Sequence, residues 1–396
     1  MLTPYCLEGG PEMSGGGDSA LNWYSRRLAH ELASAAVSVS IVGPRATNGG
    51  VQMWNDGGIP VYPSFVRGSS RAIGQALVRI QELGAPIVHV QHELFAYGGL
   101  LNAILLPFAL AYLRIRGYKI VTTIHGIMPL SEVSDEFVRA NRMPGNAAVT
   151  RIVWRTLIRA VARCSDRIHV HETFLRDLLV KEYDTKTPVT VIPLGVETVS
   201  KAPERGEARR RFGLPAEAEV ALFFGYLAAY KGIEYLLAEL QRMLQRRPAL
   251  HLVIAGSIPE RLRGSLDPET VLTRLPVERD RVHFLGFVPD AAIPNLFAAA
   301  DVLVLPYTIA MSSSGPLALA IGYGLPVLLS AAFQRSFPHA PTFFKLEPGA
   351  LAESLDAFFD NEDGLRSRSC AFLSELRERR AWPNVVKALR EVYETL

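Results

Sequence analysis

A run of small residues is the first stretch of the sequence that could bind a charged ligand. Residues 312–315 read Ser-Ser-Ser-Gly and stand between an apolar run that ends at Tyr307 and a helical pattern that begins near Pro316. Small side chains let a ligand approach the backbone, and the N–H groups and dipole of a helix N-terminus favour negative charge. Serines are also common helix N-caps. The turn therefore predicts either an anion site or a helix cap, and both interpretations stay open on the turn alone.

A lysine occupies a second turn of this kind. In "GYLAAYKG", Lys231 and Gly232 follow the apolar run "ALFF" and precede a helical pattern. A cation is electrostatically misplaced at a helix N-terminus, and a bound phosphate would account for it. The alternative is an ordinary surface lysine. In the first half of the chain, His125 ends the apolar run "TTIH" at the corresponding position.

Three glycines form a third turn before a helical pattern. Gly15, Gly16 and Gly17 carry no side chains, so a phosphate or a sugar could lie against the main chain there. The alternative is a flexible loop tip. The strand that should precede this turn can be no longer than residues 1–6.

Other polar residues give weaker indications. His169 and His171 are two apart on a predicted strand and so face one side of it. No third ligand has a convincing spacing, so they predict buried or rim histidines in preference to a metal site. Glu93, in "VQHELF", is either an acceptor contact or a rim carboxylate. The sequence has no Asp-x-Asp pair and no Cys-x-x-Cys spacing, so we expect neither a carboxylate clamp for a metal nor a zinc site.

Buried strands that alternate with helices must position these turns. Apolar runs of strand length recur in both halves of the chain, and they begin at Val37, Ile87, Lys119, Arg167 and Pro188, and again at Glu219, Leu250, Arg281, Ala300 and Leu325. Such alternation predicts parallel sheets that helices cover on both faces. The fold class is therefore α/β, and the two series predict two doubly wound domains.

A polar, proline-containing segment, "TVSKAPERGEA", separates the two series. It places the domain boundary near residue 198, with one domain over residues 1–198 and a second, which includes the terminal helix, over residues 199–396. Ligands of open α/β sheets bind beyond the carboxyl ends of the strands. We therefore expect the turns described above to face a cleft between the two domains.

The composition excludes several classes of protein. The 396 residues carry a net charge of only +3, which does not suggest a nucleic-acid binder. No secretory signal opens the sequence, and the sparse cysteines fit a reducing cytoplasm. Residues 100–119 are the most apolar run but are too short to span a bilayer. They predict a core helix, with a peripheral membrane contact through the basic end, Arg114, Arg116 and Lys119, as the alternative.

The order and spacing of these motifs resemble the GT-B glycosyltransferases, in particular the large retaining family 4, also called glycosyltransferase group 1. The resemblance covers nearly the whole chain and rests on "SGGGDSALNWYSRRLAHELA", "VTTIHG", "VIPLGVE", "FFGYLAAYKGIEYLLAEL", "LVIAGS", "VHFLGFVPDAAIPNLFAAADVLVLPY" and "SSSGPLALAIGYGLPVLLS". It implies the GT-B fold, two Rossmann-like domains that face a central cleft. The first domain would bind the acceptor and the second a nucleotide sugar.

The resemblance also implies roles for residues in these turns. The glycine loop, Gly15 to Gly17, would close on the donor diphosphate and the transferred sugar, and His125 would contact that sugar near its anomeric centre. Lys231 would bind the diphosphate. The backbone at Phe287 and Val288 would lie near the nucleobase. The turn that would supply backbone N–H groups to the phosphates comprises Ser312, Ser313, Ser314, Gly315, Pro316 and Leu317.

Three positions depart from the family pattern. Members commonly have an arginine, a second cation on the diphosphate, where this chain has Tyr226. They also usually carry a Glu-x7-Glu pair, whose positions hold Met311 and Leu319 here. Leu319 cannot accept the hydrogen bonds of the donor ribose. One branch of the family has a Ser-Gly turn in place of the glutamates, so the departures leave the nucleotide and the sugar unspecified.

The resemblance implies a metal-independent, retaining hexosyltransferase. It would move a hexose from a UDP-type or GDP-type nucleotide sugar to a hydroxyl of a glycan, a lipid-linked acceptor or a small molecule, without a further cofactor. We expect it in the cytoplasm, with the inner face of the membrane as an alternative location. The rival is a catalytically silent GT-B accessory subunit that binds a nucleotide sugar or a partner enzyme. A GT-B epimerase matches the turns less well, and a Rossmann dehydrogenase would need a GxGxxG turn in the first domain.

Overall fold

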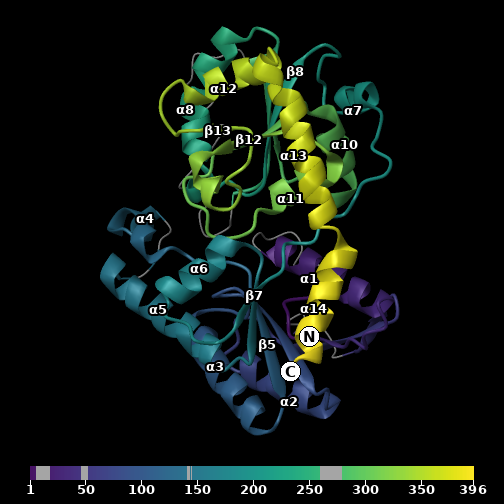
Figure 1. Ribbon diagram of the computed structural model, residues 1–396, viewed down its shortest axis with the longest axis vertical. Coiled ribbons are helices and arrows are strands. Elements are labelled where there is room, and N and C mark those ends of the chain that lie inside the picture. The colour runs from purple at the N-terminus through teal and green to yellow at the C-terminus, as the bar shows by residue number, and fades with distance from the viewer. Residues whose placement is uncertain (6–17, 46–51, 141–142, 144, 259–278) are drawn as a thin grey trace. The chain divides into compact units, whose positions relative to one another are not determined.

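The computed structural model describes residues 1–5, 18–45, 52–140, 143, 145–258 and 279–396. The chain forms two compact units (Figure 1). Unit 1 comprises Met1–Gly195, Met311–Ser313 and Trp382–Leu396, and unit 2 comprises Val196–Ala310 and Ser314–Ala381. The predicted boundary at residue 198 lies close to the junction between Gly195 and Val196.

Unit 1 is built on a largely parallel sheet. Four parallel strands run in the order β4 (Ile87–His92), β5 (Lys119–Ile124), β6 (Arg167–Val170) and β7 (Val189–Val191). Three more run in the order β1 (Ile41–Pro44), β3 (Ile59–Phe65) and β2 (Trp54–Asp56), with β2 antiparallel to β3. Leu2 pairs with Val42 of β1 and with Val90 of β4, so a very short first strand links the two sets.

Helices cover both faces of this sheet. On one face, buried side chains of α2 (Ala72–Leu83), α3 (Leu100–Ile115) and α5 (Ala147–Arg163) pack with those of the strands in one cluster. On the other face, Ala29 of α1 (Asp18–Ser34) packs against Ile41, Ile59 and Val61. The remaining helices in the described part of the unit are η2 (Leu130–Glu132), α4 (Asp135–Ala140), α6 (Thr173–Lys181) and α14 (Trp382–Glu394).

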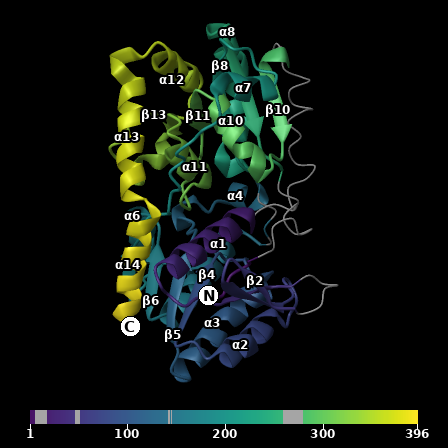
Figure 2. The same cartoon turned by 90° about the vertical axis from the view of Figure 1, so that its right-hand side faces the viewer.

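The terminal helix α14 packs in unit 1, which differs from its predicted place in the second domain. It lies beside α1, as Figures 1 and 2 show in yellow and purple. The Tyr393 hydroxyl is 2.6 Å from Nδ1 of His89, and the ring of Trp382 lies 5.8 Å from that of Tyr24. Gly195 leaves room for Trp382, since a Cβ atom there would lie 2.6 Å from the indole ring. An amphipathic pattern shows that a helix has an apolar face but not which sheet that face covers.

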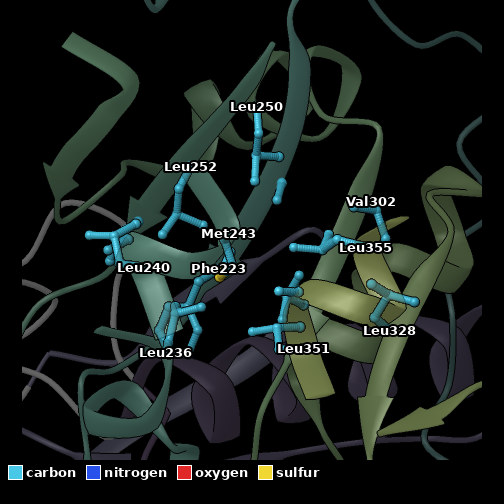
Figure 3. Close-up of a cluster of buried hydrophobic side chains, with 14 of the residues drawn as sticks. Phe223, Leu236, Leu240, Met243, Leu250, Leu252, Val302, Leu328, Leu351 and Leu355 are labelled. Atoms are coloured by element: carbon cyan, nitrogen blue, oxygen red, sulfur yellow. The ribbon is translucent and has the colours of Figure 1, made fainter. Parts of the chain in front are cut away.

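Unit 2 contains a six-stranded parallel sheet. Its strands run in the order β10 (Val282–Gly286), β9 (Leu250–Ala255), β8 (Glu219–Phe224), β11 (Val302–Leu305), β12 (Val327–Ser330) and β13 (Phe343–Phe344). Strand side chains such as Phe223 and Leu252 pack against Leu240 of α8 (Ile233–Arg246) and Leu355 of α12 (Ala350–Phe359) in the core that Figure 3 shows.

The other described helices of unit 2 are shorter, apart from α13. They are α7 (Arg205–Arg211), η3 (Ala229–Lys231), η5 (Arg279–Arg281), η6 (Asp290–Ala292), α10 (Ile293–Ala299), α11 (Gly315–Tyr323), η7 (Ala331–Arg335), η8 (Glu362–Gly364) and α13 (Leu365–Arg379). In neither unit does the described part of the chain contain a helix that is both long enough and apolar enough to cross a bilayer.

The structure confirms the predicted α/β class and all ten predicted strands. The sequence analysis missed β3, because Pro60 and Pro63 lack the N–H that a strand interior normally needs. The signal was nevertheless present, since burial alternates strictly along this strand, with Ile59, Val61 and Phe65 inward.

Candidate active site

His125 follows β5 in unit 1 and is buried among other aromatic rings. Its Nε2 lies 2.8 Å from Oε1 of Gln91, and its Nδ1 lies 3.2 Å from Nε2 of His171. Nδ1 of His171 lies in turn 3.2 Å from the Ile192 carbonyl oxygen, so a chain of buried polar contacts runs from Gln91 through both histidines to that carbonyl. The ring of Tyr24 packs edge-on against both histidines. Both nitrogens of His125 are therefore bonded within unit 1.

A second chain of hydrogen bonds lies beside this one. The Ile192 carbonyl can only accept, so Nε2 of His169, 2.8 Å away, must donate to it. Nδ1 of His169 then accepts from the Thr123 hydroxyl, whose oxygen lies 2.6 Å from Nε2 of His89. That nitrogen also lies 3.3 Å from the side-chain nitrogen of Gln91, and Nδ1 of His89 lies 2.6 Å from the Tyr393 hydroxyl. These contacts link the Ile192 carbonyl to helix α14.

His125 and His169 are held in the neutral form. Burial, together with the nearby His169 and His92, lowers the pKa of His125 to about 3. Burial also lowers the pKa of His169 to about 4, although its bond to Ile192 opposes the shift. His169 and His171 share a face, as predicted, and their ring centres are 4.8 Å apart. In the part of the chain that the structure describes, no three side chains of the metal-binding types are grouped so that they could hold an ion.

Glu172 is a site residue that the sequence analysis missed. It follows β6 directly, and its side chain is only 5% exposed. One of its oxygens accepts a 2.7 Å hydrogen bond from the Ser313 hydroxyl. The short segment around Ser313 belongs to unit 1, because Ser312 pairs with Gly126 and the Ile127 N–H donates to the Met311 carbonyl. A charged residue at the end of a buried strand, in "IHVHE", was the available signal.

Glu93 follows β4 and is half-buried. Desolvation raises its pKa to about 7, and the nearby Arg67 opposes the rise. Glu93 can therefore hold a proton near neutral pH, which is unusual for a carboxyl group. This does not decide between its two predicted roles, acceptor contact and rim carboxylate.

In unit 2, Lys231 is buried and faces an aromatic ring. Its side chain is 7% exposed, and the ammonium nitrogen lies 5.5 Å from the centre of the Tyr307 ring. Within the described residues it has no carboxylate partner, although a buried cation is costly without one. Gly225 provides its space, because a Cβ atom there would lie 2.7 Å from the Lys231 nitrogen. The predicted cation thus ends inside the unit and not at its surface.

The turn before α11 fills one of its two predicted roles, that of a helix cap. Ser314 is the N-cap, as its hydroxyl accepts from the Leu317 N–H at 3.3 Å and lies 3.2 Å from the Tyr307 hydroxyl. Pro316 has no N–H to offer. Among residues 315–317, the amide of Gly315 is therefore the donor that remains for an anion. We had expected the whole turn to supply N–H groups.

The other predicted donor-binding residues lie at the ends of strands in unit 2. Tyr226 follows β8 and is half-buried, and Val288 is buried beyond β10. Phe287 is 54% exposed, so its ring is accessible. Gly15, Gly16 and Gly17 lie outside the described residues. The structure therefore locates each predicted site residue except this glycine loop.

Two family models match successive parts of the chain. One described as Glycosyltransferase Family 4 matches residues 21–200, and one described as Glycosyl transferases group 1 matches residues 218–361. The first matched range lies in unit 1 up to Gly195, and the second lies in unit 2 apart from Met311–Ser313.

Curated relatives have similar sequences over part of the chain. An uncharacterized glycosyltransferase of Methanocaldococcus jannaschii is 30% identical over 48% of this chain and 48% of the relative. A D-inositol 3-phosphate glycosyltransferase of Streptomyces scabiei is 29% identical over 69% of this chain and 62% of the relative. The matches thus span 48% and 62% of the length of these relatives, which is less than two thirds.

Solved structures resemble the chain over almost its full length. Sucrose-phosphate synthase from Thermosynechococcus elongatus has a TM-score of 0.69 at 18% identity and covers 96% of this chain and 93% of its own. Anabaena HepE in complex with UDP and glucose has a TM-score of 0.69 at 16% identity and covers 100% and 99%. At such identities the likeness establishes the fold, which is GT-B.

Proposed function

Because the chain belongs to the group 1 glycosyltransferases, we propose that it transfers a hexose from a nucleotide-diphosphate sugar to an acceptor hydroxyl. The observation that carries this proposal is Lys231, a buried ammonium group without a carboxylate partner among the described residues. A buried cation of this kind is stabilised when an anion binds beside it. The diphosphate of a sugar donor supplies such an anion.

Residues of unit 2 would bind the donor. The Lys231 ammonium and the Gly315 amide would meet the negative charge of the diphosphate, and the exposed ring of Phe287 would lie near the nucleobase. HepE, the structural neighbour of similar fold, has been solved with UDP and with UDP-glucose. This supports a uridine nucleotide as the first donor to test.

Catalysis would rest on stabilisation of the leaving group. The bond between the anomeric carbon and the diphosphate oxygen breaks, and the acceptor oxygen forms a new bond on the same face, with retention of configuration. The acceptor proton passes to the departing diphosphate. Lys231 would stabilise the charge that develops on this oxygen. Since the sequence has no Asp-x-Asp pair, we propose that these groups act without a metal ion.

Residues of unit 1 would serve the sugar and the acceptor. Both nitrogens of His125 are already bonded, so a direct hydrogen bond to the sugar requires one of these bonds to open. The neutral ring would then contact the sugar without adding charge. Glu93 lies beyond β4 and Glu172 beyond β6, and either carboxyl group could accept a hydrogen bond from an acceptor.

The first test is nucleotide binding. The purified full chain would be screened by thermal shift and calorimetry against UDP, GDP, ADP and their hexose conjugates, together with Lys231→Ala and a control, Lys345→Ala. Lys345 is in the same unit and is exposed. We expect one nucleotide to stabilise the wild type and the control by mass action, about 2.7 kcal/mol at 100 times the dissociation constant, but not Lys231→Ala.

Two results would contradict the proposal. If Lys231→Ala binds as tightly as the wild type, the lysine does not hold the diphosphate. If no nucleotide binds, the residues at Tyr226, Met311 and Leu319 have abolished donor binding, and the chain is an accessory GT-B protein.

A further inference from the structure

Helix α3 exposes an apolar stripe on its outer side. Leu101, Ile104, Phe108, Tyr112 and Ile115 follow one another at intervals of three or four residues, so they share one face. Each is exposed, with Phe108 at 69% and Ile115 at 84%. The opposite face, which includes Leu106 and Leu110, is buried in the core of unit 1. Contiguous exposed apolar surface of this kind marks an interaction site.

The stripe continues onto α2. Val78 of α2 is 56% exposed, and a groove of about 550 Å³ runs between the two helices. Its walls are mainly apolar and include Leu77, Val78, Leu105 and Phe108. The helices lie side by side in both views (Figures 1 and 2). None of the proposed catalytic or donor-binding residues lines this groove.

Basic residues border the apolar stripe. Arg114, Arg116 and Lys119 follow at the end of α3, and α5, which packs against α3, carries Arg151, Arg155, Arg159 and Arg163. Residues 100–119 and 147–163 contain no acidic residue, although the whole chain has a net charge of only +3. Two of these arginines are paired, Arg114 with Asp166 and Arg159 with Asp184. Arg155 is exposed and lies near the same Asp184, and Arg116 is exposed. On α2, Arg79 pairs with Glu82.

We propose that this surface, formed by α3 with the adjoining sides of α2 and α5 and called here the α3 face, docks on an anionic lipid bilayer. An apolar stripe with basic residues at its border matches the acyl boundary and the anionic headgroups of such a surface. A second copy of the chain fits less well. A two-fold interface would place the same patch against itself, so that its excess of basic over acidic side chains would face the same excess on the other copy.

Docking has a consequence for the substrate. An enzyme held at a bilayer by its first unit meets acceptors that are anchored in that bilayer at high local concentration. The acceptor would therefore be lipid-linked, and this part of the inference rests on the proposed function. The docking itself does not, since it depends only on the α3 face.

The test is flotation of the full chain with vesicles of phosphatidylcholine alone or mixed with phosphatidylglycerol. Two double variants probe the face, Ile104→Ser with Phe108→Ser for the stripe and Arg116→Gln with Lys119→Gln for the border. The control is Val180→Ser, because Val180 is an exposed apolar residue of α6, another helix of the unit. Urea unfolding of each variant verifies the fold, and nucleotide binding without vesicles verifies the donor site independently.

We expect the wild type and Val180→Ser to float with the anionic vesicles and much less with phosphatidylcholine. The stripe variant should bind at least about tenfold more weakly. The border variant should lose affinity for anionic vesicles, and raising the salt from about 0.01 M to about 1 M should weaken wild-type binding. Binding that the stripe variant retains in full would overturn the proposal. The proposal would also be overturned if the wild type did not bind either kind of vesicle. It would be overturned as well if the wild type formed a dimer in solution and the stripe variant were a monomer.

Discussion

The ammonium nitrogen of Lys231 lies 5.5 Å from the centre of the Tyr307 ring, in the interior of unit 2. A cation over an aromatic face gains roughly 0.5 to 2 kcal/mol. This is less than the several kcal/mol that effective desolvation of an ion costs. The contact thus offsets only part of the free-energy cost of burying the charge. The remaining cost lowers the stability of the unliganded protein, and a bound anion would reduce it.

Replacing Lys231 by methionine should separate stability from function. Without nucleotide, Lys231→Met should raise the free energy of unfolding in urea by about 1 kcal/mol or more, since an apolar chain of similar length replaces a buried charge. The same change should weaken nucleotide-diphosphate binding at least about tenfold, as measured by calorimetry. A variant that loses stability would instead show that the lysine supports the fold.

The cap of α11 predicts a modest loss of stability. Ser314→Ala removes the acceptor for the Leu317 N–H and a partner of the Tyr307 hydroxyl. We expect the free energy of unfolding to fall by about 1 kcal/mol, and Ser314→Thr to restore part of it. The neighbouring Ser312 is a control, because the contact described for it is a backbone pairing. An equal loss in Ser312→Ala would argue against the cap.

The buried histidines predict that stability falls in mild acid. His89, His92, His125 and His169 all have pKa values lowered below 6.5 by burial, so the unfolded chain binds more protons than the folded one below that pH. The stability that they contribute is present above pH 6.5 and is lost as the pH falls, by about 1.4 kcal/mol per pH unit for each histidine.

One carboxyl group opposes this trend. The raised pKa of Glu93 means that its contribution is present in acid and is lost as the pH rises toward 7. Four histidines should outweigh it. Urea unfolding at about pH 7.5, 6.5 and 5.5 should show a steady decrease, and a flat profile would mean that the rings are hydrated or charged in the native state.

A matched pair of glycines tests the turn that holds Lys231. Gly232 has φ +74°, and a Cβ atom there would lie 1.8 Å from the Pro306 carbonyl oxygen, whereas Gly213 has φ +66° and open space around it. Gly213→Ala should cost about 1 to 2 kcal/mol, which is the left-handed strain alone. Gly232→Ala should cost several kcal/mol more or prevent folding, as thermal unfolding would measure. If both variants lost the same free energy of unfolding, the backbone at Pro306 would have to move away from the new Cβ atom without strain.

The sequence predicted the turns better than it predicted what their side chains contact. Gly225 and Lys231 were identifiable because a parallel strand must end in a turn, and turns favour glycine. Both nitrogens of His125 form hydrogen bonds, with Gln91 at the end of β4 and with His171 just after β6. The local sequence around His125 does not show which strands lie beside β5, so these partners could not be predicted from it. The same holds for Glu172, whose partner Ser313 is far along the chain. Strand β3 was not predicted because it contains Pro60 and Pro63, and prolines are unusual inside strands, although its apolar residues alternate clearly.

Helix α14 gives the chain an unusual order of assembly. Its residues leave the ribosome after the whole of unit 2, yet they pack in the first unit, where Trp382 lies against Gly195 and Tyr393 contacts His89. While unit 2 is being synthesised, unit 1 lacks helix α14. The apolar surface of unit 1 that α14 covers is then exposed, and chaperones can bind it. A fragment that stops at Gly195 would share this defect, and joining residues 382–396 to its end is the simplest route to an independently folding first unit.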